Sequence, residues 1–228
     1  MDKSKALPIP VLVTGFDPFE DQAINPSWEV AKALDGWQYG DATVVARQLP
    51  CVFHEAINSL QQAMDDIKPS LIICLGQAGG RTDISLERIA INLDDARIPD
   101  NADQQPIDQA IIAKAPAAYF SSLPIKAIVR QISGAGIAAA VSNTAGTFVC
   151  NHVFFGLMHI IAQKNRNART RPPVRGGFVH LPYLPEQVSA YPGTPSIPLD
   201  AMIKGIQTAI QTAIDVKTDI VETGGQLH

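Results

Sequence analysis

The chain has 228 residues, of which 46% are hydrophobic and 18% are charged. These values are typical of a globular protein with one sizeable core, and we expect a single domain over residues 1–228. The net charge of −4 argues against nucleic acid or an anionic membrane as a partner. No N-terminal segment has the basic, apolar, small-residue order of a signal peptide, so we expect a cytoplasmic protein.

The elements expected along the chain alternate between short β-branched runs and longer segments of helical periodicity, which is typical of a layered α/β domain. In chain order we expect a strand over 11–16, a helix over 25–34, a strand over 42–49, a helix over 52–67, strands over 70–76 and 84–93, a helix over 125–136, a strand over 137–143, a helix over 149–163, a strand over 176–185 and a helix over 198–216. Asn25 or Ser27 is a candidate cap for the first helix. Residues 94–122 show no clear pattern.

One long stretch, residues 131–163, contains no Asp, Glu, Lys or Arg. Polar residues and glycines interrupt it, and its apolar runs fall far short of the roughly 18 residues that a membrane-spanning helix needs. We interpret this stretch as buried interior. The basic cluster that follows it, at 164–175, is interpreted as a solvated loop.

The three cysteines, Cys51, Cys74 and Cys150, form neither an even set nor a C-x-x-C pair. We therefore expect reduced thiols rather than a disulfide framework. Cys74 lies in an apolar strand and should be inert, whereas the pattern around Cys51 is ambiguous.

Cys150 is the candidate nucleophile. Free cysteines are usually buried packing residues, but the segment SNTAGT (142–147) has the composition of a turn that leads into a helix beginning near Val149. The sulfur would then lie in the first turn of that helix, where free N–H groups and the macrodipole favour a thiolate.

A thiol nucleophile needs a general base, and the chain has five histidines. His152 would point away from Cys150, because two helical residues are about 200° apart around the axis. His180 ends an apolar strand, and such residues project into the ligand crevice of α/β sheets. The sequence alone leaves a structural role for His180 open. Three histidines are expected at surface, packing or terminal positions: His54, His159 and His228.

Glu87 is the candidate that would orient the imidazole of His180. It lies in an otherwise apolar strand, where a carboxylate is costly unless it is paired. The alternative is an ion pair with Arg88 or Arg97 on a solvent-exposed face. Placement alone therefore suggests Glu87, Cys150 and His180 as a catalytic set.

Two glycine-rich turns do not fit a nucleotide site. GQAGGR (76–81) lacks the G-x-G-x-x-G spacing and has no P-loop lysine, and SGAGIAAA (133–140) precedes a strand instead of a helix. Cys150 with His152 would need two further metal ligands at readable spacing, and none is found. We expect no cofactor and no metal.

Five motifs together resemble the pyrrolidone-carboxylate peptidases, the pyroglutamyl peptidase I family of cysteine exopeptidases. They are VLVTGFDPFEDQAINPSWE (11–29), LPCVF (49–53), GQAGGRTDISLERIAINLDDARIPDN (76–101), SNTAGTFVCNH (142–152) and GFVHLPYLPEQ (177–187). The resemblance covers most of the chain in the expected order. It implies a three-layer α/β/α domain with a twisted, mostly parallel mixed sheet, assembled as a homotetramer.

The resemblance also implies roles for single residues. The catalytic glutamate, cysteine and histidine of the family fall on Glu87, Cys150 and His180, and Arg97 would help to polarise the reacting carbonyl. Five residues would line or adjoin the pocket: Phe16, Phe19, Gln77, Phe148 and Val149. The substrates implied are peptides with an N-terminal pyroglutamyl residue.

Two departures from the family pattern are visible. The segment with NRNARTRPPVR is longer than expected, and Cys51 stands where the family pattern has threonine. The Cys51 change leaves open a protein that binds the lactam without hydrolysing it. A hydrolase of the same layout acting on another amide is a further alternative.

Overall fold

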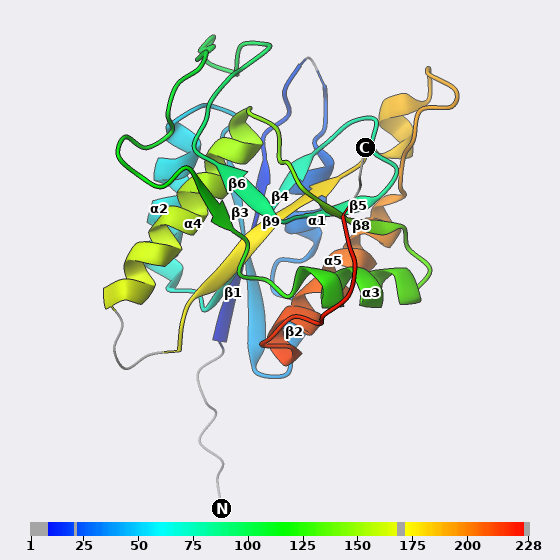
Figure 1. The fold of residues 1–228 in the computed structure, drawn as a ribbon. Coiled ribbons are helices and arrows are strands. Elements are labelled where there is room, and N and C mark those ends of the chain that lie inside the picture. Colours follow the sequence, from blue (N-terminus) through cyan, green and yellow to red (C-terminus); the bar gives the residue numbers. More distant parts are fainter. Residues whose placement is uncertain (1–8, 21, 168–171, 226–228) are drawn as a thin grey trace, which may run out of the picture.

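A seven-stranded sheet forms the centre of the structure, a computed structural model that describes residues 9–20, 22–167 and 172–225 (Figure 1). The strand order is β2-β3-β1-β4-β9-β5-β8. The strands are β1 (Ile9–Phe16), β2 (Gln38–Tyr39), β3 (Ala42–Leu49), β4 (Leu71–Gln77), β5 (Ile84–Glu87), β8 (Ala139–Ser142) and β9 (Arg175–Leu181). The pairings are parallel except for β2 with β3 and β5 with β9. The predicted mixed, mostly parallel sheet is therefore confirmed.

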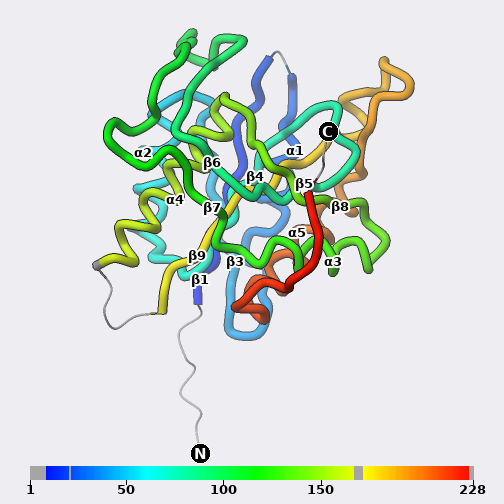
Figure 2. Tube along the Cα trace, in the orientation of Figure 1, coloured from blue at the N-terminus to red at the C-terminus, as the bar shows by residue number. Residues whose placement is uncertain are grey.

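Helices cover both faces of this sheet (Figures 1 and 2). They are α1 (Pro26–Ala33), α2 (Glu55–Ile67), α3 (Ile125–Gly134), α4 (Val149–Asn167) and α5 (Leu199–Asp215), with a short 3-10 helix at Pro185–Val188. One hydrophobic cluster lies between the sheet and α1, α3 and α5, and a second lies between the sheet and α2 and α4. Two helical layers around one sheet make the α/β/α arrangement that the resemblance implied.

The start of α1 is fastened to the end of β1. Asn25 caps the helix, because its Oδ1 accepts a hydrogen bond from the Ser27 N–H at 3.0 Å. Ser27 Oγ in turn accepts a hydrogen bond from the Phe16 N–H at 2.9 Å. Gly15 permits this approach, since a β-carbon there would lie 2.3 Å from the Ser27 carbonyl oxygen. The link holds Phe16 at the edge of the sheet where β1 ends.

The carboxyl ends of the parallel strands β1, β4 and β9 meet at the same edge. Gly76 pairs with His180 and Gln77 with Leu181 in the β4–β9 register. In α/β sheets, the crevice outside these carboxyl ends is the usual place for a ligand. The topology therefore brings Phe16, Gln77 and His180 to one side of the molecule.

The strand predicted over 84–93 is wrong as one element. It divides into β5 in the large sheet and β6 (Ile89–Ile91), which pairs with β7 (Ala118–Phe120) in a separate two-stranded sheet. At the break, the Arg88 N–H donates to the Ser142 carbonyl while the Arg88 carbonyl accepts from Ser121. The two sides of Arg88 thus have different partners, and the alternating sequence pattern does not reveal that change.

Other boundaries differ by a few residues. The helix predicted from residue 52 begins at Glu55, because His54 has a φ of 63° and ends the preceding turn. The helix predicted to end at 163 continues to Asn167, so the predicted loop over 164–175 begins later, and its residues 168–171 lie outside the described part. The short strand β2 had no sequence signal.

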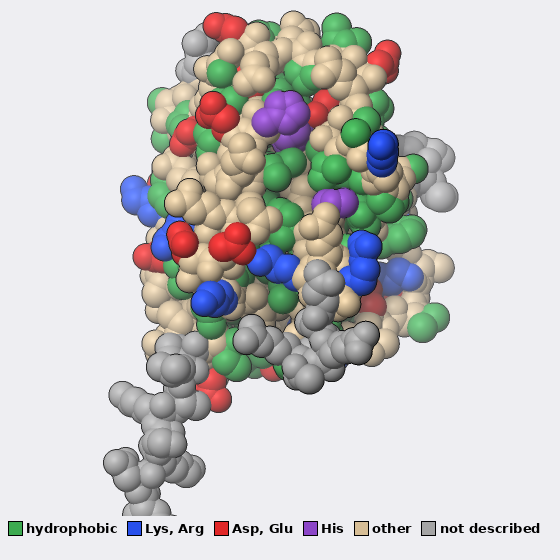
Figure 3. Space-filling model, turned by 90° about the vertical axis from the view of Figure 1, so that its left-hand side faces the viewer, with side chains coloured by type: hydrophobic (Ala, Val, Ile, Leu, Met, Phe, Trp, Pro, Cys, Tyr) green, Lys and Arg blue, Asp and Glu red, His purple; other side chains and the backbone are tan. Residues whose placement is uncertain are grey.

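The outer face over α2 and α4 carries charged side chains of both signs, interspersed with hydrophobic and other polar side chains (Figure 3). Within the described ranges, none of the helices has the length and apolar character that a membrane crossing requires.

Candidate active site

A cavity of about 200 Å³ opens at the carboxyl edge of β1, β4 and β9. Six of the residues that the sequence analysis assigned to the site line it: Phe16, Phe19, Gln77, Phe148, Cys150 and His180. They come from four separate parts of the chain. The cavity is therefore the place where the candidate nucleophile and the candidate base meet.

Cys150 is the second residue of α4, as the turn-then-helix pattern predicted. The hydrogen bond from the His152 N–H to the carbonyl of Phe148, the residue before α4, closes the first turn of the helix. The N–H groups of Val149, Cys150 and Asn151 precede it, so they have no acceptor within the helix. These donors belong to the same first turn of α4 as Cys150.

Asn151 fixes the start of α4. Its side chain is fully buried; it accepts a hydrogen bond from the Ile91 N–H at 3.0 Å and donates to the carbonyl oxygens of Ile91 and Leu93. These bonds attach the first helical turn to β6. Cys150 is thereby held at a defined height above the sheet.

Gly76 lets the Cys150 sulfur approach the sheet. A β-carbon at position 76 would lie 2.8 Å from Cys150 Sγ and 2.8 Å from the ring of Phe178. Because Gly76 pairs in register with His180, the sulfur rests on the strand next to the imidazole.

His180 and Glu87 form a buried pair. His180 Nδ1 lies 2.7 Å from Glu87 Oε1, and the two side chains are 4% and 0% exposed. His180 also packs against Phe178, with ring centroids 4.9 Å apart. With Nδ1 turned toward the carboxylate, Nε2 is the ring nitrogen available on the cavity side.

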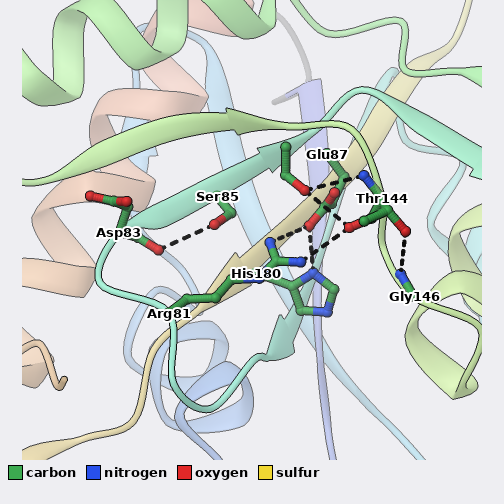
Figure 4. A network of polar contacts seen from close by, with 8 residues as sticks. Arg81, Asp83, Ser85, Glu87, Thr144, Gly146 and His180 are labelled. Carbon is green, nitrogen blue, oxygen red and sulfur yellow. Dashed lines mark hydrogen bonds and ion pairs between the residues drawn. The ribbon is translucent and has the colours of Figure 1, made fainter. Parts of the chain in front are cut away.

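Arg81 is the second partner of Glu87 (Figure 4). Its Nη1 lies 2.6 Å from the same oxygen, Glu87 Oε1, and its Nη2 donates to the Thr144 carbonyl at 3.1 Å. Neither Arg88 nor Arg97 pairs with Glu87, so the expected alternative of a solvent-exposed ion pair with one of them is wrong. The carboxylate is fully buried, and its cationic partner comes from the turn after β4.

The environment of Glu87 favours the carboxylate. Burial raises its pKa, but the hydrogen bond and charge of His180, together with the charge of Arg81, outweigh that effect and hold the pKa below its ordinary value. Glu87 is therefore ionised at neutral pH and can stabilise a proton on His180.

The environment of Cys150 favours the neutral thiol. Burial raises its pKa well above the ordinary value, the neighbouring Cys51 and Glu87 raise it further, and the charge of Arg81 opposes them. This finding runs against the expected resting thiolate, because desolvation disfavours the charged form of the thiol. If Cys150 is to act as a nucleophile, its thiol must therefore lose a proton as the reaction begins.

The other two cysteines lie in surroundings that suppress ionisation. Burial raises the pKa of Cys74 to about 12, as expected for a thiol inside β4. Burial, with the nearby carboxylates of Asp100 and Asp17, also raises the pKa of Cys51 to about 12. Cys51 lines the cavity as a neutral thiol. All three cysteines are free.

Two residues named through the family resemblance do not line the cavity. Val149 is fully buried in the cluster under α4, so its side chain adds no surface to the cavity. Arg97 is exposed, and its guanidinium makes no hydrogen bond or ion pair within the described residues. In this structure the arginine in the cavity wall is Arg81.

Aromatic rings form the apolar wall. Phe19 and Phe148 have ring centroids 6.3 Å apart, and Phe148 meets Phe53 edge-on at 5.4 Å. Phe16 lies 6.4 Å from Phe178, which also contacts His180. The wall is therefore continuous with the buried core of the α2–α4 side.

His152 is a buried histidine whose two ring nitrogens both have partners. Its Nδ1 lies 2.7 Å from Asp94 Oδ2, and its Nε2 accepts a hydrogen bond from the His54 N–H at 2.9 Å. Both ring nitrogens are occupied, so His152 is not available as the base for Cys150. His54 is exposed at the start of α2, and His159 bonds Tyr119 on the outer part of α4. His228 lies outside the described residues.

Several cavity residues were missed by sequence reasoning. They are Asn25, Ala78, Arg81, Ala145 and Gly146. Arg81 carried one usable signal, since it is a charged residue in a glycine-rich turn directly after a buried strand. The others are small residues, or a helix cap whose local role hides its second position in the cavity wall.

A thiol, an imidazole and a buried carboxylate at the carboxyl edge of a mostly parallel sheet define a class: an α/β protein with the site of a cysteine hydrolase. The model of one family, described as pyroglutamyl peptidase, matches residues 9–216. The chain belongs to the pyroglutamyl peptidase family, and the assignment expected from the five motifs is confirmed.

Relatives and solved structures agree with this family. A pyrrolidone-carboxylate peptidase of Cupriavidus taiwanensis is 58% identical over 218 residues, covering 96% of this chain and 99% of the relative. The crystal structure of pyroglutamyl peptidase I from Bacillus amyloliquefaciens matches with a TM-score of 0.88 and 49% identity, covering 95% of this chain and all of that one. A mutant pyrrolidone carboxyl peptidase from Pyrococcus furiosus matches with a TM-score of 0.86 and 42% identity, covering 91% and 99%.

Proposed function

We propose that the protein is a cysteine exopeptidase that removes an N-terminal pyroglutamyl residue from peptides. The observation that carries this proposal is the His180–Glu87 hydrogen bond at the edge of the cavity that Cys150 lines. Membership of the pyroglutamyl peptidase family supports the choice of substrate. No cofactor or metal has a part in the proposed reaction.

The cavity suits a flat, uncharged ring. Phe16, Phe19 and Phe148 offer aromatic surface on which a lactam ring packs well. A free α-ammonium group would lose its hydration in this apolar wall, which is costly without a partner. The proposed pocket therefore selects the lactam over an ordinary amino terminus.

Gln77 is the proposed polar contact for the lactam. Its Oε1 accepts a hydrogen bond from Gln187 Nε2 at 2.9 Å, which orients the amide. No hydrogen bond of Gln77 Nε2 is found within the described residues, so this nitrogen is the donor left for a lactam carbonyl. Gln187 would act by holding Gln77 in that orientation.

A second hollow beside the cavity is available for the rest of the peptide. This hollow of about 460 Å³ shares Phe19 with the cavity and is also lined by Gln22, Ile98 and Asn101. We propose that residues beyond the scissile bond leave the cavity in this direction. Peptides of different sequence would then share one catalytic site.

The proposed reaction has two steps. His180 accepts the thiol proton, and Cys150 Sγ bonds to the pyroglutamyl carbonyl carbon. The tetrahedral intermediate collapses, the C–N bond breaks and His180 passes the proton to the departing amine. Water then attacks the thioester with His180 as base, which releases pyroglutamate and restores the thiol.

Glu87 and the α4 terminus would stabilise the charges that develop. Glu87 holds His180 with Nδ1 toward the carboxylate and stabilises the imidazolium. The free N–H groups of Val149 and Cys150 are the proposed donors to the oxyanion. Arg97 is also proposed, from the family resemblance, to act on the carbonyl; with its exposed guanidinium it would have to turn inward when substrate binds.

The test compares a pyroglutamyl amide reporter with a matched reporter that has a free α-amine, using Cys150→Ala and Cys150→Ser. We expect cleavage of the lactam reporter alone, and loss of that cleavage in both variants. Full turnover by Cys150→Ala would refute the proposal. Calorimetric binding of pyroglutamate without turnover by the wild type would indicate a binding protein instead.

We further propose, on the family resemblance, a cytoplasmic homotetramer. The three free thiols fit a reducing compartment. Sedimentation equilibrium would measure the assembly, and a monomer at micromolar concentration would refute the tetramer. Fractionation of cells that express the protein would test its location.

A further inference from the structure

Arg81 occupies a position that none of the expected roles accounts for. It lines the cavity, it contacts Glu87 Oε1 at 2.6 Å, and it donates to the Thr144 carbonyl at 3.1 Å. Figure 4 shows Arg81 and His180 both reaching toward the Glu87 carboxylate. One guanidinium thus contacts the strand that carries the acid and the loop that leads to the nucleophile.

We propose that Arg81 is a positioning residue that keeps Glu87 ionised and oriented for His180 and favours ionisation of Cys150. This inference rests on the proposed function for its catalytic readout. It adds a fourth side chain, from the turn after β4, to the Glu87, Cys150 and His180 set.

The burial of Glu87 makes a cationic partner necessary. The Glu87 side chain is 0% exposed, and its Oε2 makes no hydrogen bond within the described residues. Without Arg81, Glu87 would keep its hydrogen bond with His180 and the contribution of the Ser142 side chain, but it would lose its guanidinium partner. A buried carboxylate in that state tends to take up a proton, and a protonated Glu87 would no longer stabilise the imidazolium.

The shared oxygen fixes the orientation of the carboxylate. Arg81 Nη1 and His180 Nδ1 both bind Oε1, at 2.6 Å and 2.7 Å. Arg81 is itself held by the Thr144 carbonyl, in the loop that ends at α4. The side chain therefore couples the direction of Glu87 to the position of the loop before Cys150.

The charge of Arg81 also acts on the nucleophile. It lowers the pKa of the Cys150 thiol, although burial and the neighbouring Cys51 and Glu87 raise that pKa by more. A positive charge in the cavity wall stabilises the thiolate as the proton moves to His180. Loss of the charge would make this proton transfer less favourable.

A merely structural role predicts a different result. If Arg81 only joined two loops, its replacement would lower the stability of the protein and would reduce activity by the same factor at every pH. A positioning role through Glu87 predicts that the acid limb of kcat/KM moves to higher pH, because the pKa of Glu87 rises without the cation. The pH profile therefore separates the two roles.

The experiment compares Arg81→Gln and Arg81→Lys with the wild type on the pyroglutamyl reporter across the pH range. For Arg81→Gln we expect kcat to fall about ten- to a hundredfold, by analogy with outer-shell partners that orient metal-binding side chains, with KM little changed and the acid limb shifted upward. Arg81→Lys keeps the charge and should restore most of the activity and the position of the limb. Arg88→Gln is the matched control, because Arg88 follows Glu87 in sequence but donates to the Gly224 carbonyl instead.

A second readout does not depend on peptidase activity. The rate at which iodoacetamide alkylates Cys150 is measured as a function of pH. The rise of this rate with pH should occur at a higher pH in Arg81→Gln than in the wild type. If the wild type fails to cleave the reporter but this shift is present, the proposed function fails and the inference on Arg81 stands.

Thermal unfolding of each variant shows which variants are folded under the assay conditions, and only folded variants are compared. The inference would be overturned if Arg81→Gln is folded and both its acid limb of kcat/KM and the pH dependence of its Cys150 alkylation match those of the wild type. If Arg81→Gln does not fold, Arg81→Lys decides: a folded lysine variant as inactive as Cys150→Ala would overturn the inference, and near-normal activity would support it.

Discussion

Cys150 Sγ rests on the backbone of Gly76, so closely that a β-carbon at position 76 would lie 2.8 Å away. The same glycine pairs in register with His180 on the neighbouring strand. The absence of a side chain at one position of β4 therefore lets the proposed nucleophile lie against the strand that neighbours the proposed base. This contact joins α4 to the sheet at the point where the chemistry is proposed.

We predict that Gly76→Ala impairs catalysis more than it impairs folding. The added methyl group would meet both Cys150 Sγ and the buried ring of Phe178, and such overpacking costs about 1–3 kcal/mol. The displaced sulfur should lower kcat, measured with the pyroglutamyl reporter at a temperature well below the midpoint of unfolding.

Gly134→Ala is the control for this prediction. Gly134 ends α3, and a β-carbon there would meet nothing within 4 Å. It should keep full activity and gain stability, by about 0.4–1 kcal/mol if the change mainly restricts the unfolded chain. Wild-type kcat in Gly76→Ala would contradict the assigned contact.

The two buried histidines should respond in opposite ways to substitution. His180→Ala should abolish turnover and leave the protein folded, since His180 is the proposed base. His152→Ala should cost about 3–5 kcal/mol of unfolding free energy, because it leaves the buried Asp94 carboxylate without its partner and the His54 N–H without its acceptor. Denaturant titration and kcat together test the contrast, and a His152→Ala protein of normal stability would contradict it.

The stability contributed by Glu87 should depend on pH in a defined direction. Its pKa is lowered from the ordinary 4.5 by the hydrogen bond and charge of His180 and by the charge of Arg81, acting against burial. A depressed pKa in the folded state contributes stability that is complete above 4.5 and is lost as the pH falls through the lower folded value. The stability difference between the wild type and Glu87→Gln should therefore shrink as the medium is acidified below 4.5.

Urea denaturation at several pH values measures this difference. Cys150→Ala serves as the control, because it removes the proposed nucleophile and leaves the carboxylate and its partners in place. Its stability curve should run parallel to that of the wild type. A wild-type to Glu87→Gln difference that grows on acidification would have the wrong sign and would refute the assignment.

The Cys51 thiol should be unreactive and should not be needed for turnover, although it lines the cavity. Its pKa is raised to about 12 by burial and by the nearby Asp100 and Asp17 carboxylates, so it remains a neutral thiol in the neutral range. Near pH 8, iodoacetamide should modify Cys150 first, with His180 as proton acceptor. Cys51→Thr should keep kcat and the modification of Cys150, as peptide mapping would show. Modification of Cys51 before Cys150 would contradict this prediction.

Local sequence determined much of this protein. The β4 run of apolar residues and the amphipathic helices were recognisable because burial imposes a period on each element. Asn25 capped its helix, and Cys150 came in the first helical turn, because caps and turns depend on a few adjacent residues. The five motifs also identified the family, and the placement of Glu87 and His180 in their strands directed attention to both residues before any contact was visible.

Only the tertiary structure decided how distant residues meet. The cationic partner of Glu87 is Arg81, since the turn after β4 folds back toward β5, and no local pattern favours that arginine over Arg88 or Arg97. The same holds for the break at Arg88, where one strand changes sheets, and for the neutral state of the Cys150 thiol. Burial is a property of the assembled layers, and desolvation by those layers disfavours the thiolate that a helix terminus would by itself favour.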